Sequence, residues 1–361
     1  MPRPKKVATT SDMVLAAQLF YKDKEARKNI AKRLHTDLHG VAWLLAEAER
    51  HHIVEFQVHQ TIDSDLEHRI KKLYPHVQRV LLVPGYPVET SAQYAELLKR
   101  YAVVTAKYFD ELLDYSEDQP IHVGITGGET TLEFVNAVPE RIRKNLYIHT
   151  TALVSRGRLQ KSGSHIEPSV NASILWSRSG RIPGRCEYAT VSPYRIEEHG
   201  RNKRAAVAAE LRVLVESRPI RDVINAMDNI DIAFAHIGLV DPGDVPPIQK
   251  NRITVNSVLK AIVTPKELKE EGAIADLSYC LFDKDGNSRD DWTFFLSAGH
   301  YAADEKRRGL GFFKQMVADD KKVIVPAGPY KLPAIKAALQ AKLFNVLITD
   351  EDTARRVADG K

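Results

Sequence analysis

A glycine-rich loop between an apolar run and a helical pattern carries the clearest chemistry in this sequence. The apolar run, Ile121 to Ile125, is typical of a buried strand, and the helical pattern begins at Glu129. The N–H groups at a helix N-terminus point outward, and glycine lets an anion approach the backbone closely. The loop is therefore a candidate phosphate-binding site, and its residues are Thr126, Gly127, Gly128, Thr130 and Thr131. A tight turn whose threonines only cap the helix is the alternative.

Two other glycine-containing loops follow predicted strands. They are residues 238–244, GLVDPGD, and residues 327–331, AGPYK. In open parallel sheets ligands bind at the carboxyl ends of the strands, so all three loops qualify as binding loops. The last one ends at Lys331, before a helix that we expect to begin near Pro333, and its ammonium group could pair with a phosphate or a carboxylate. Most lysines are simply solvated, which is the other interpretation.

The elements that must position these loops alternate between strands and helices. The pattern predicts strands over 79–85, 145–154, 189–194, 230–240 and 277–287, helices over 91–113, 168–178 and near 201–215, and a closing strand–loop–helix–strand–helix series over 323–357. Repeated βαβ units give a mostly parallel sheet covered on both faces. The fold class is therefore α/β, with a Rossmann-like sheet.

The first 58 residues predict a separate helical unit. Three helices are expected: around 13–21 with Ser11 or Asp12 as the cap, over 24–34 with Asp23 as the cap, and from Thr36 or Asp37 to about 50. An alternating strand pattern follows over 53–58, and a linking helix is expected within 59–76. Three short helices and a strand form a winged helix-turn-helix pattern, whose third helix would enter the major groove of DNA.

Basic residues on the second helix could contact DNA phosphates beside that groove. They are Arg27, Lys28, Lys32 and Arg33. The third helix would offer the residues near its start to the groove, and these are Thr36, Asp37, His39 and Gly40. This start lacks an early Arg, Lys, Gln or Asn for bidentate reading of bases. A small helical interaction module with no role on DNA is the alternative.

The amino-acid composition indicates what kind of protein this is and in which compartment it is expected. Hydrophobic residues make up 43% of the 361 residues and charged residues 27%, which is ordinary for a globular chain. No apolar run approaches the ~20 residues that span a bilayer, and the polar, basic N-terminus is not a secretory signal. The two cysteines have neither metal-type spacing nor a disulfide framework. We therefore expect a cytoplasmic protein without a membrane partner, a metal or a cofactor.

Along nearly its whole length the chain resembles the SorC family of sugar-responsive transcriptional regulators. The similar stretches are NIAKRLHTDLHGVAWLLAEAERHHIVEFQV at the front, GITGGETT in the middle, and EGAIADLSYCLFDKDG and PAGPYKLPAIKAALQAKLFNVLITDEDTA toward the end. The resemblance implies a DNA-binding domain over 1–58 and an effector-binding and oligomerisation domain over 77–361. It also implies a fold related to sugar-phosphate isomerases and deaminases, a phosphorylated sugar or polyol effector, operator DNA as a partner, and a dimer or tetramer.

Residues can be carried over from the resemblance motif by motif. It implies that the glycine loop surrounds the effector phosphate, that Lys331 pairs with it, and that Asp276 binds a sugar hydroxyl. Two features depart from the family: the start of the third helix lacks the Ser/Arg-rich sequence of relatives, and Glu129 places an acidic group beside the presumed anion.

Two competing functions remain beside a sugar-phosphate-controlled regulator. A sugar-phosphate isomerase or deaminase would need an acid and a base in the pocket, for which His236, Asp241 and Asp276 are candidates. The Asp-Gly-His block of deaminases is not visible in HIGLVDPG, so we expect no enzyme. A scaffold or sensor that keeps only the fold is the other alternative.

Overall fold

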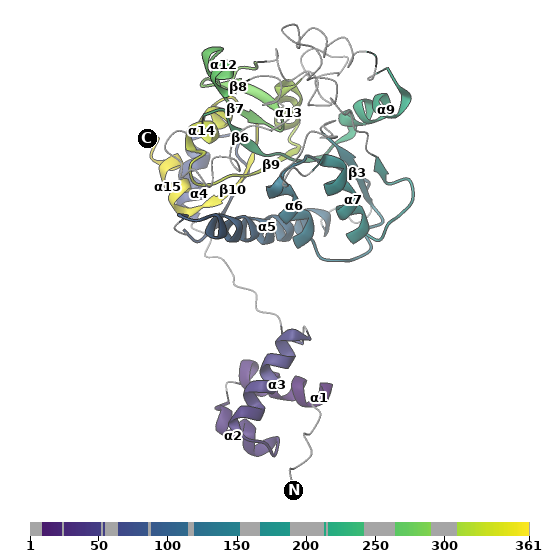
Figure 1. The fold of residues 1–361 in the computed structure, drawn as a ribbon, viewed down its shortest axis with the longest axis vertical. Helices are drawn as coiled ribbons and strands as arrows, with labels where there is room; N and C mark the ends of the chain where they lie inside the picture. The colour runs from purple at the N-terminus through teal and green to yellow at the C-terminus, as the bar shows by residue number, and fades with distance from the viewer. Residues whose placement is uncertain are drawn as a thin grey trace. The chain divides into compact units, whose positions relative to one another are not determined.

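The computed structural model describes residues 9–23, 25–51, 53–54, 64–85, 88–114, 119–151, 167–187, 213, 216–241, 264–289 and 309–360. Contacts divide the chain into two compact units, Met1–Gln60 and Thr61–Lys361. Figure 1 shows that the described part of the first unit is helical and that the second unit combines strands with helices.

The first unit contains the three predicted helices around a small core. They are α1 (Thr10–Ala17, continued by the π-helix Gln18–Lys22), α2 (Arg27–Arg33) and α3 (Leu38–Arg50). Their apolar faces meet in one cluster that includes Leu19, Ile30, Val41 and Leu45. Spacing of three and four residues places such side chains on one face of a helix, which is why the pattern was visible in the sequence.

Two helix starts differ from the prediction. Thr9, rather than Ser11 or Asp12, caps α1: its hydroxyl accepts from the Asp12 N–H, and the Asp12 carboxylate accepts from the Thr9 N–H in a capping box. The second helix begins at Arg27 rather than at residue 24, because Asp23 ends the π-helix and provides no cap for α2. The third helix begins as predicted, with Asp37 as its cap.

The strand predicted over 53–58 lies mostly outside the described residues. Ile53 and Val54 form a bend in which both N–H groups donate to the carbonyl of Ala48. After the gap, α4 (Ser64–Leu73) packs on α15 (Glu351–Ala358) in the second unit and buries Leu66 and Ile70.

A seven-stranded parallel sheet organises the second unit. Its order is β1 (Arg79–Val83), β10 (Val346–Asp350), β9 (Lys322–Pro326), β5 (Ile232–Phe234), β2 (Ile121–Ile125), β3 (Leu146–Thr150) and β4 (Cys186–Glu187). Every residue of β10 is buried. Since neighbouring residues of a strand point to opposite faces, both faces of the sheet are covered, and the predicted α/β class is confirmed.

The helices of this unit pack against one another in neighbouring pairs. Contacts run from α5 (Ser91–Asp114) to α6 (Glu129–Ala137) and from α6 to α7 (Pro168–Arg178), and α15 contacts both α4 and α14 (Leu332–Gln340) (Figure 1). Phe109, Phe134 and Phe234 join α5 and α6 to the sheet through ring contacts of 4.0–5.6 Å. The other described helices are α9 (Arg218–Ala226) with the 3-10 turn Met227–Asn229, α12 (Pro265–Glu270) and α13 (Leu310–Ala318).

The prediction was wrong about two strands. The strand expected over 230–240 is interrupted at Ala235 and His236, and its second half, β6 (Ile237–Leu239), belongs to a separate antiparallel sheet. In that sheet β7 (Ala273–Leu277) pairs with β6 and with β8 (Cys280–Asp283). The strand expected over 277–287 is therefore shorter than predicted: Leu277 ends β7, only residues 280–283 form β8, and a turn follows at residues 284–285, close to the turn expected at Asp285 and Gly286. The expected strand 189–194 and helix 201–215 lie outside the described residues, apart from Val213.

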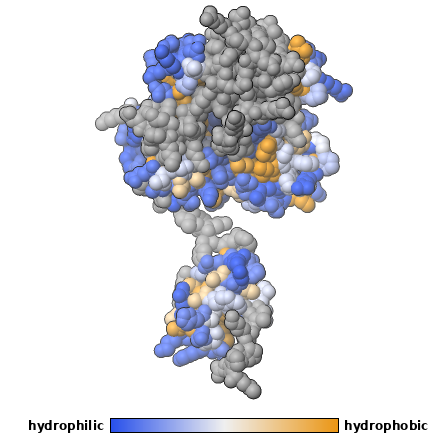
Figure 2. Space-filling model, viewed as in Figure 1, coloured by the Kyte–Doolittle hydropathy of each residue, from blue (hydrophilic) through white to orange (hydrophobic). Residues whose placement is uncertain are grey.

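The described surface is mostly polar. Figure 2 shows hydrophilic residues over much of both units and a smaller area of hydrophobic residues on the larger one. Among the described helices, none combines the length and the apolar composition that crossing a bilayer requires. Cys186 and Cys280 are both free thiols.

Candidate functional site

The order of the parallel strands changes direction between β2 and β5. From β2 the chain continues to β3 and β4 on one side, whereas β5, β9 and β10 lie on the other side of β2. Such a switch point leaves a crevice beyond the carboxyl ends of the two strands, where α/β proteins bind ligands. Thr126 directly follows β2 and His236 lies two residues beyond β5, and the Thr126 Oγ1 and His236 Nδ1 atoms are 3.4 Å apart.

The glycine loop forms the β2 side of this crevice. Gly128 has a φ of 95°, in the left-handed region that glycine tolerates, and serves as the N-cap of α6. No side chain in the described part of the chain caps α6, so its positive N-terminal end is available to a ligand. Thr126 and Thr131 are buried, Gly127 is buried, and Thr130 is half-buried in the first turn of α6.

Asn171 of α7 holds the glycine loop in place. Its Nδ2 donates to the carbonyls of Thr126 at 3.0 Å and Gly128 at 3.4 Å. The Asn171 side chain is fully buried, and its Oδ1 has no hydrogen-bond partner among the described residues. Asn171 was not predicted as a site residue, although a single amide on the apolar side of a predicted helix was a signal.

Lys331 is a buried cation on the β9 side. It is 6% exposed, directly precedes α14, and its Nζ donates to the carbonyl of Ile237 at 2.5 Å. Burial lowers the pKa of Lys331 to about 8, and the Asp276 and Glu129 carboxylates oppose this shift. Glu129 therefore lies close enough to Lys331 to stabilise its charge.

Asp276, in strand β7 of the antiparallel sheet, lies beside His236 at the switch point. Its Oδ2 lies 3.5 Å from His236 Nε2 and accepts a hydrogen bond from the Tyr279 N–H at 2.8 Å. The other carboxylate oxygen, Oδ1, is buried without a hydrogen-bond partner in the described part of the molecule. A buried acceptor without a hydrogen bond lowers the stability of the folded protein unless a ligand or a water molecule donates to it.

A strained hairpin turn places Tyr279 against His236. Ser278 and Tyr279 connect β7 to β8 with φ values of 46° and 72°, which residues other than glycine rarely adopt. The Ser278 N–H donates to the His236 carbonyl, and the two rings of His236 and Tyr279 meet edge to face at 4.8 Å. Such strain persists where surrounding contacts impose it, often at binding sites.

The structure therefore brings most of the predicted effector residues together. We call the following residues the switch-point site: Thr126, Gly127, Gly128, Asn171, His236, Asp276 and Lys331. Of the loop predicted over 238–244, only residues 238–241 are described, and Gly238 and Leu239 belong to β6 rather than to a loop. Asp241 instead bonds to Lys269 at 2.6 Å, and both side chains are well exposed.

Replacing Asn171 tests how strongly the loop depends on it. In Asn171→Ala two carbonyls lose their buried donor, and we expect the free energy of unfolding to fall by about 1–2 kcal/mol. Urea denaturation measures this change. Ser173→Ala on the same helix is the control and should leave stability nearly unchanged; equal effects of both variants would contradict the role of Asn171.

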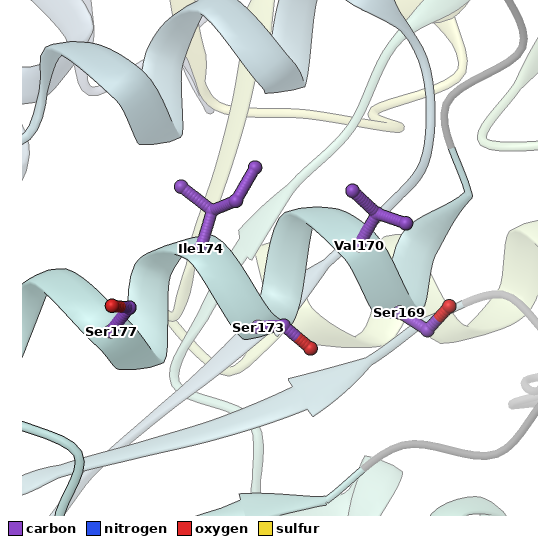
Figure 3. Close-up of a pocket in the computed structure, with 5 residues that line it drawn as sticks. All are labelled: Ser169, Val170, Ser173, Ile174 and Ser177. Carbon is purple, nitrogen blue, oxygen red and sulfur yellow. The ribbon is translucent and has the colours of Figure 1, made fainter.

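A separate hollow runs along the outer face of α7. Figure 3 shows its described lining, in which three serines share one side of the helix and two apolar side chains point away from them: Ser169, Val170, Ser173, Ile174 and Ser177. None of these residues belongs to the switch-point site. In the described residues, no group of three or more His, Cys, Asp or Glu side chains could hold a metal ion.

The candidate DNA-contacting residues of the first unit are exposed, except for the half-buried Gly40. Arg27, Lys28 and Lys32 project from α2, and Arg27 also lies 5.1 Å from the centre of the Phe20 ring. Thr36 and His39 are exposed, whereas the Asp37 carboxylate accepts from the Gly40 N–H at 2.7 Å. Gly40 is glycine for a steric reason, because a Cβ there would lie 2.0 Å from Thr36 Oγ1.

Comparison with known proteins supports a sugar-binding domain. Residues 204–358 match the family model described as "Putative sugar-binding domain". A comparison with curated proteins finds no match.

Solved structures of transcriptional regulators share the fold. The full-length sorbitol operon regulator SorC from Klebsiella pneumoniae is 15% identical with a TM-score of 0.64, over 98% of this chain and 100% of that one. A domain of a possible sugar-binding transcriptional regulator from Arthrobacter aurescens TC1 is 20% identical with a TM-score of 0.60, over 84% and 100%. A DeoR family transcriptional regulator from Listeria monocytogenes is 16% identical with a TM-score of 0.54, over 82% and 100%.

These similarities confirm the resemblance seen in the sequence. The three matched structures are described as transcriptional regulators. Residues 204–358 match the model of this sugar-binding domain, and the chain has the fold of SorC- and DeoR-family transcriptional regulators.

Proposed function

We propose that this protein is a DNA-binding regulator of carbohydrate genes whose operator binding is controlled by a phosphorylated sugar or polyol. The observation that carries the proposal is the buried Lys331 beside an uncapped helix N-terminus at the switch point. A buried ammonium and a helix dipole together favour an anion, and glycine lets an anion approach the backbone closely. The Asp276 Oδ1 and Asn171 Oδ1 atoms remain as acceptors for sugar hydroxyl groups.

The second part of the proposal concerns the helical unit. The exposed cations of α2 would bind DNA phosphates, and α3 would enter the major groove. Since helix-turn-helix proteins commonly read two half-sites, the protein would act as a homodimer or a tetramer. The effector changes DNA affinity only if it binds one arrangement of the subunits more tightly than another.

One titration tests both parts. A duplex is selected from a random library with the full-length protein, labelled, and its binding is followed by anisotropy while a panel of sugar and polyol phosphates is added. We expect at least one phosphorylated compound to change the dissociation constant of the duplex by about 5- to 150-fold. The same compound without its phosphate is the control and should have little effect. If no compound changes either DNA binding or thermal stability, effector control is wrong.

A further inference from the structure

The exposed face of α3 is apolar along most of its length. Leu38 and Trp43 are 56% and 46% exposed, and Ala42 and Ala46 continue the same stripe at helical spacing. The opposite face of α3 is buried in the core of the unit, through Val41, Leu44, Leu45 and Ala48. Figure 2 shows hydrophobic residues exposed among hydrophilic ones on this unit.

Polar groups lie only at the ends of this stripe. At its start the Asp37 carboxylate is occupied as the helix cap. At its end Glu49 accepts a hydrogen bond from the Tyr21 hydroxyl at 2.8 Å, and Arg50 pairs with Glu47. Between His39 and Glu49, the exposed side chains are Ala42, Trp43 and Ala46, of which Trp43 carries the one donor, its indole N–H.

The neighbouring helix indicates what covers the stripe. In α2, which packs against α3, Arg27, Lys28 and Lys32 are exposed, and this arrangement complements a polyanion better than an apolar protein surface. In the major groove of DNA the apolar feature is the C5-methyl group of thymine, which alanine and aromatic side chains contact. A bidentate reader of guanine or adenine would need side chains that this stripe lacks.

We propose that the stripe formed by Leu38, Ala42, Trp43 and Ala46 reads thymine methyl groups in the major groove. The inference rests on the proposed DNA-binding function and specifies how sequence is recognised there. The operator half-site would then carry thymines at the positions facing α3, with Trp43 adding a hydrogen bond to an acceptor on a base edge.

Replacing thymine with uracil tests this proposal, because uracil lacks only the methyl group. The probe is the duplex selected by the full-length protein, remade with deoxyuridine at each thymine in turn. We expect binding to weaken about fourfold at each contacted thymine, the effect of exposing roughly one buried methyl group. Trp43→Ala should remove the preference for thymine at one position. Leu15→Ala, an exposed apolar residue of α1, is the matched control and should keep it.

The outcomes separate the inference from the proposed function. Lys28→Ala should weaken binding to the thymine and the uracil duplexes equally. It should also reduce the slope of the logarithm of affinity against the logarithm of salt concentration by about one. Equal affinity of the unaltered protein for thymine and uracil duplexes would overturn the methyl readout while DNA binding stands. If Trp43→Ala and Leu38→Ala both keep full discrimination, α3 is not the reader. Failure to select any duplex would overturn the DNA-binding function and the readout with it.

Discussion

Lys331→Ala should weaken binding of the proposed phosphorylated effector by about 10- to 100-fold, the loss expected when a charge-assisted hydrogen bond to a buried anion is removed. Among the described residues of the switch-point site, Lys331 carries the positive charge. Its Nζ donates to the Ile237 carbonyl. Calorimetry with the compound identified in the titration measures the change. Lys336→Ala, in the helix α14 that follows Lys331, removes an equal charge outside the site and should leave the affinity unchanged.

The pH dependence of effector affinity gives a second readout of the same prediction. Because burial lowers the pKa of Lys331 to about 8, raising the pH above 8 deprotonates the unliganded site. A phosphate monoester is already a dianion there, since its second pKa is about 6. Binding must then take up a proton, and the dissociation constant should rise up to about tenfold per pH unit above 8 and stay flat just below it. Lys331→Ala should abolish this rise; a rise that persists in the variant would place the phosphate elsewhere.

Local signals predicted much of the fold. Asp37 marks the start of α3, Pro168 marks the start of α7, and the closing series from β9 to α15 follows the predicted order. Each of these elements has a cap, a proline or an unbroken apolar period that acts within a few residues. The glycine loop and Lys331 were found for the same reason, because strand, glycine and helix follow one another along the chain.

The rest of the site depends on contacts between distant segments. Residues 230–240 were predicted as one strand, yet β6 pairs with β7 in the antiparallel sheet, and His236 lies at the break between β5 and β6. No local period reports such a change of partner, because burial of both halves looks alike in sequence. Likewise, Asp276 approaches His236 only through the β7–β8 hairpin. The positions of His236 and Asp276 in the switch-point site were therefore less predictable than its glycine loop and Lys331.

Gly328→Ala should destabilise the protein and damage the effector site together. Gly328 is buried in the loop after β9, and a Cβ there would lie 1.9 Å from the Tyr101 hydroxyl and 3.1 Å from Asp350 Oδ2. Tyr101 cannot move aside easily, since it is 2% exposed and donates to Asp350 at 3.0 Å. Overpacking of this kind costs about 3 kcal/mol of unfolding free energy. The Lys331 N–H donates to the Gly328 carbonyl, so a displaced loop would also move Lys331.

A double-mutant cycle identifies the clash as the cause. Burial and the Asp350 carboxylate hold the pKa of Tyr101 well above its ordinary value, so its hydroxyl remains a donor, and Tyr101→Phe alone should cost about 1 kcal/mol. In Gly328→Ala/Tyr101→Phe the closest contact disappears while the ring carbon at 2.8 Å remains. We therefore expect the double variant to unfold at a higher urea concentration than the sum of the single effects predicts. Strict additivity would mean that the cost of Gly328→Ala arises in the loop backbone and not at Tyr101, and effector affinity would then not recover with stability in the double variant.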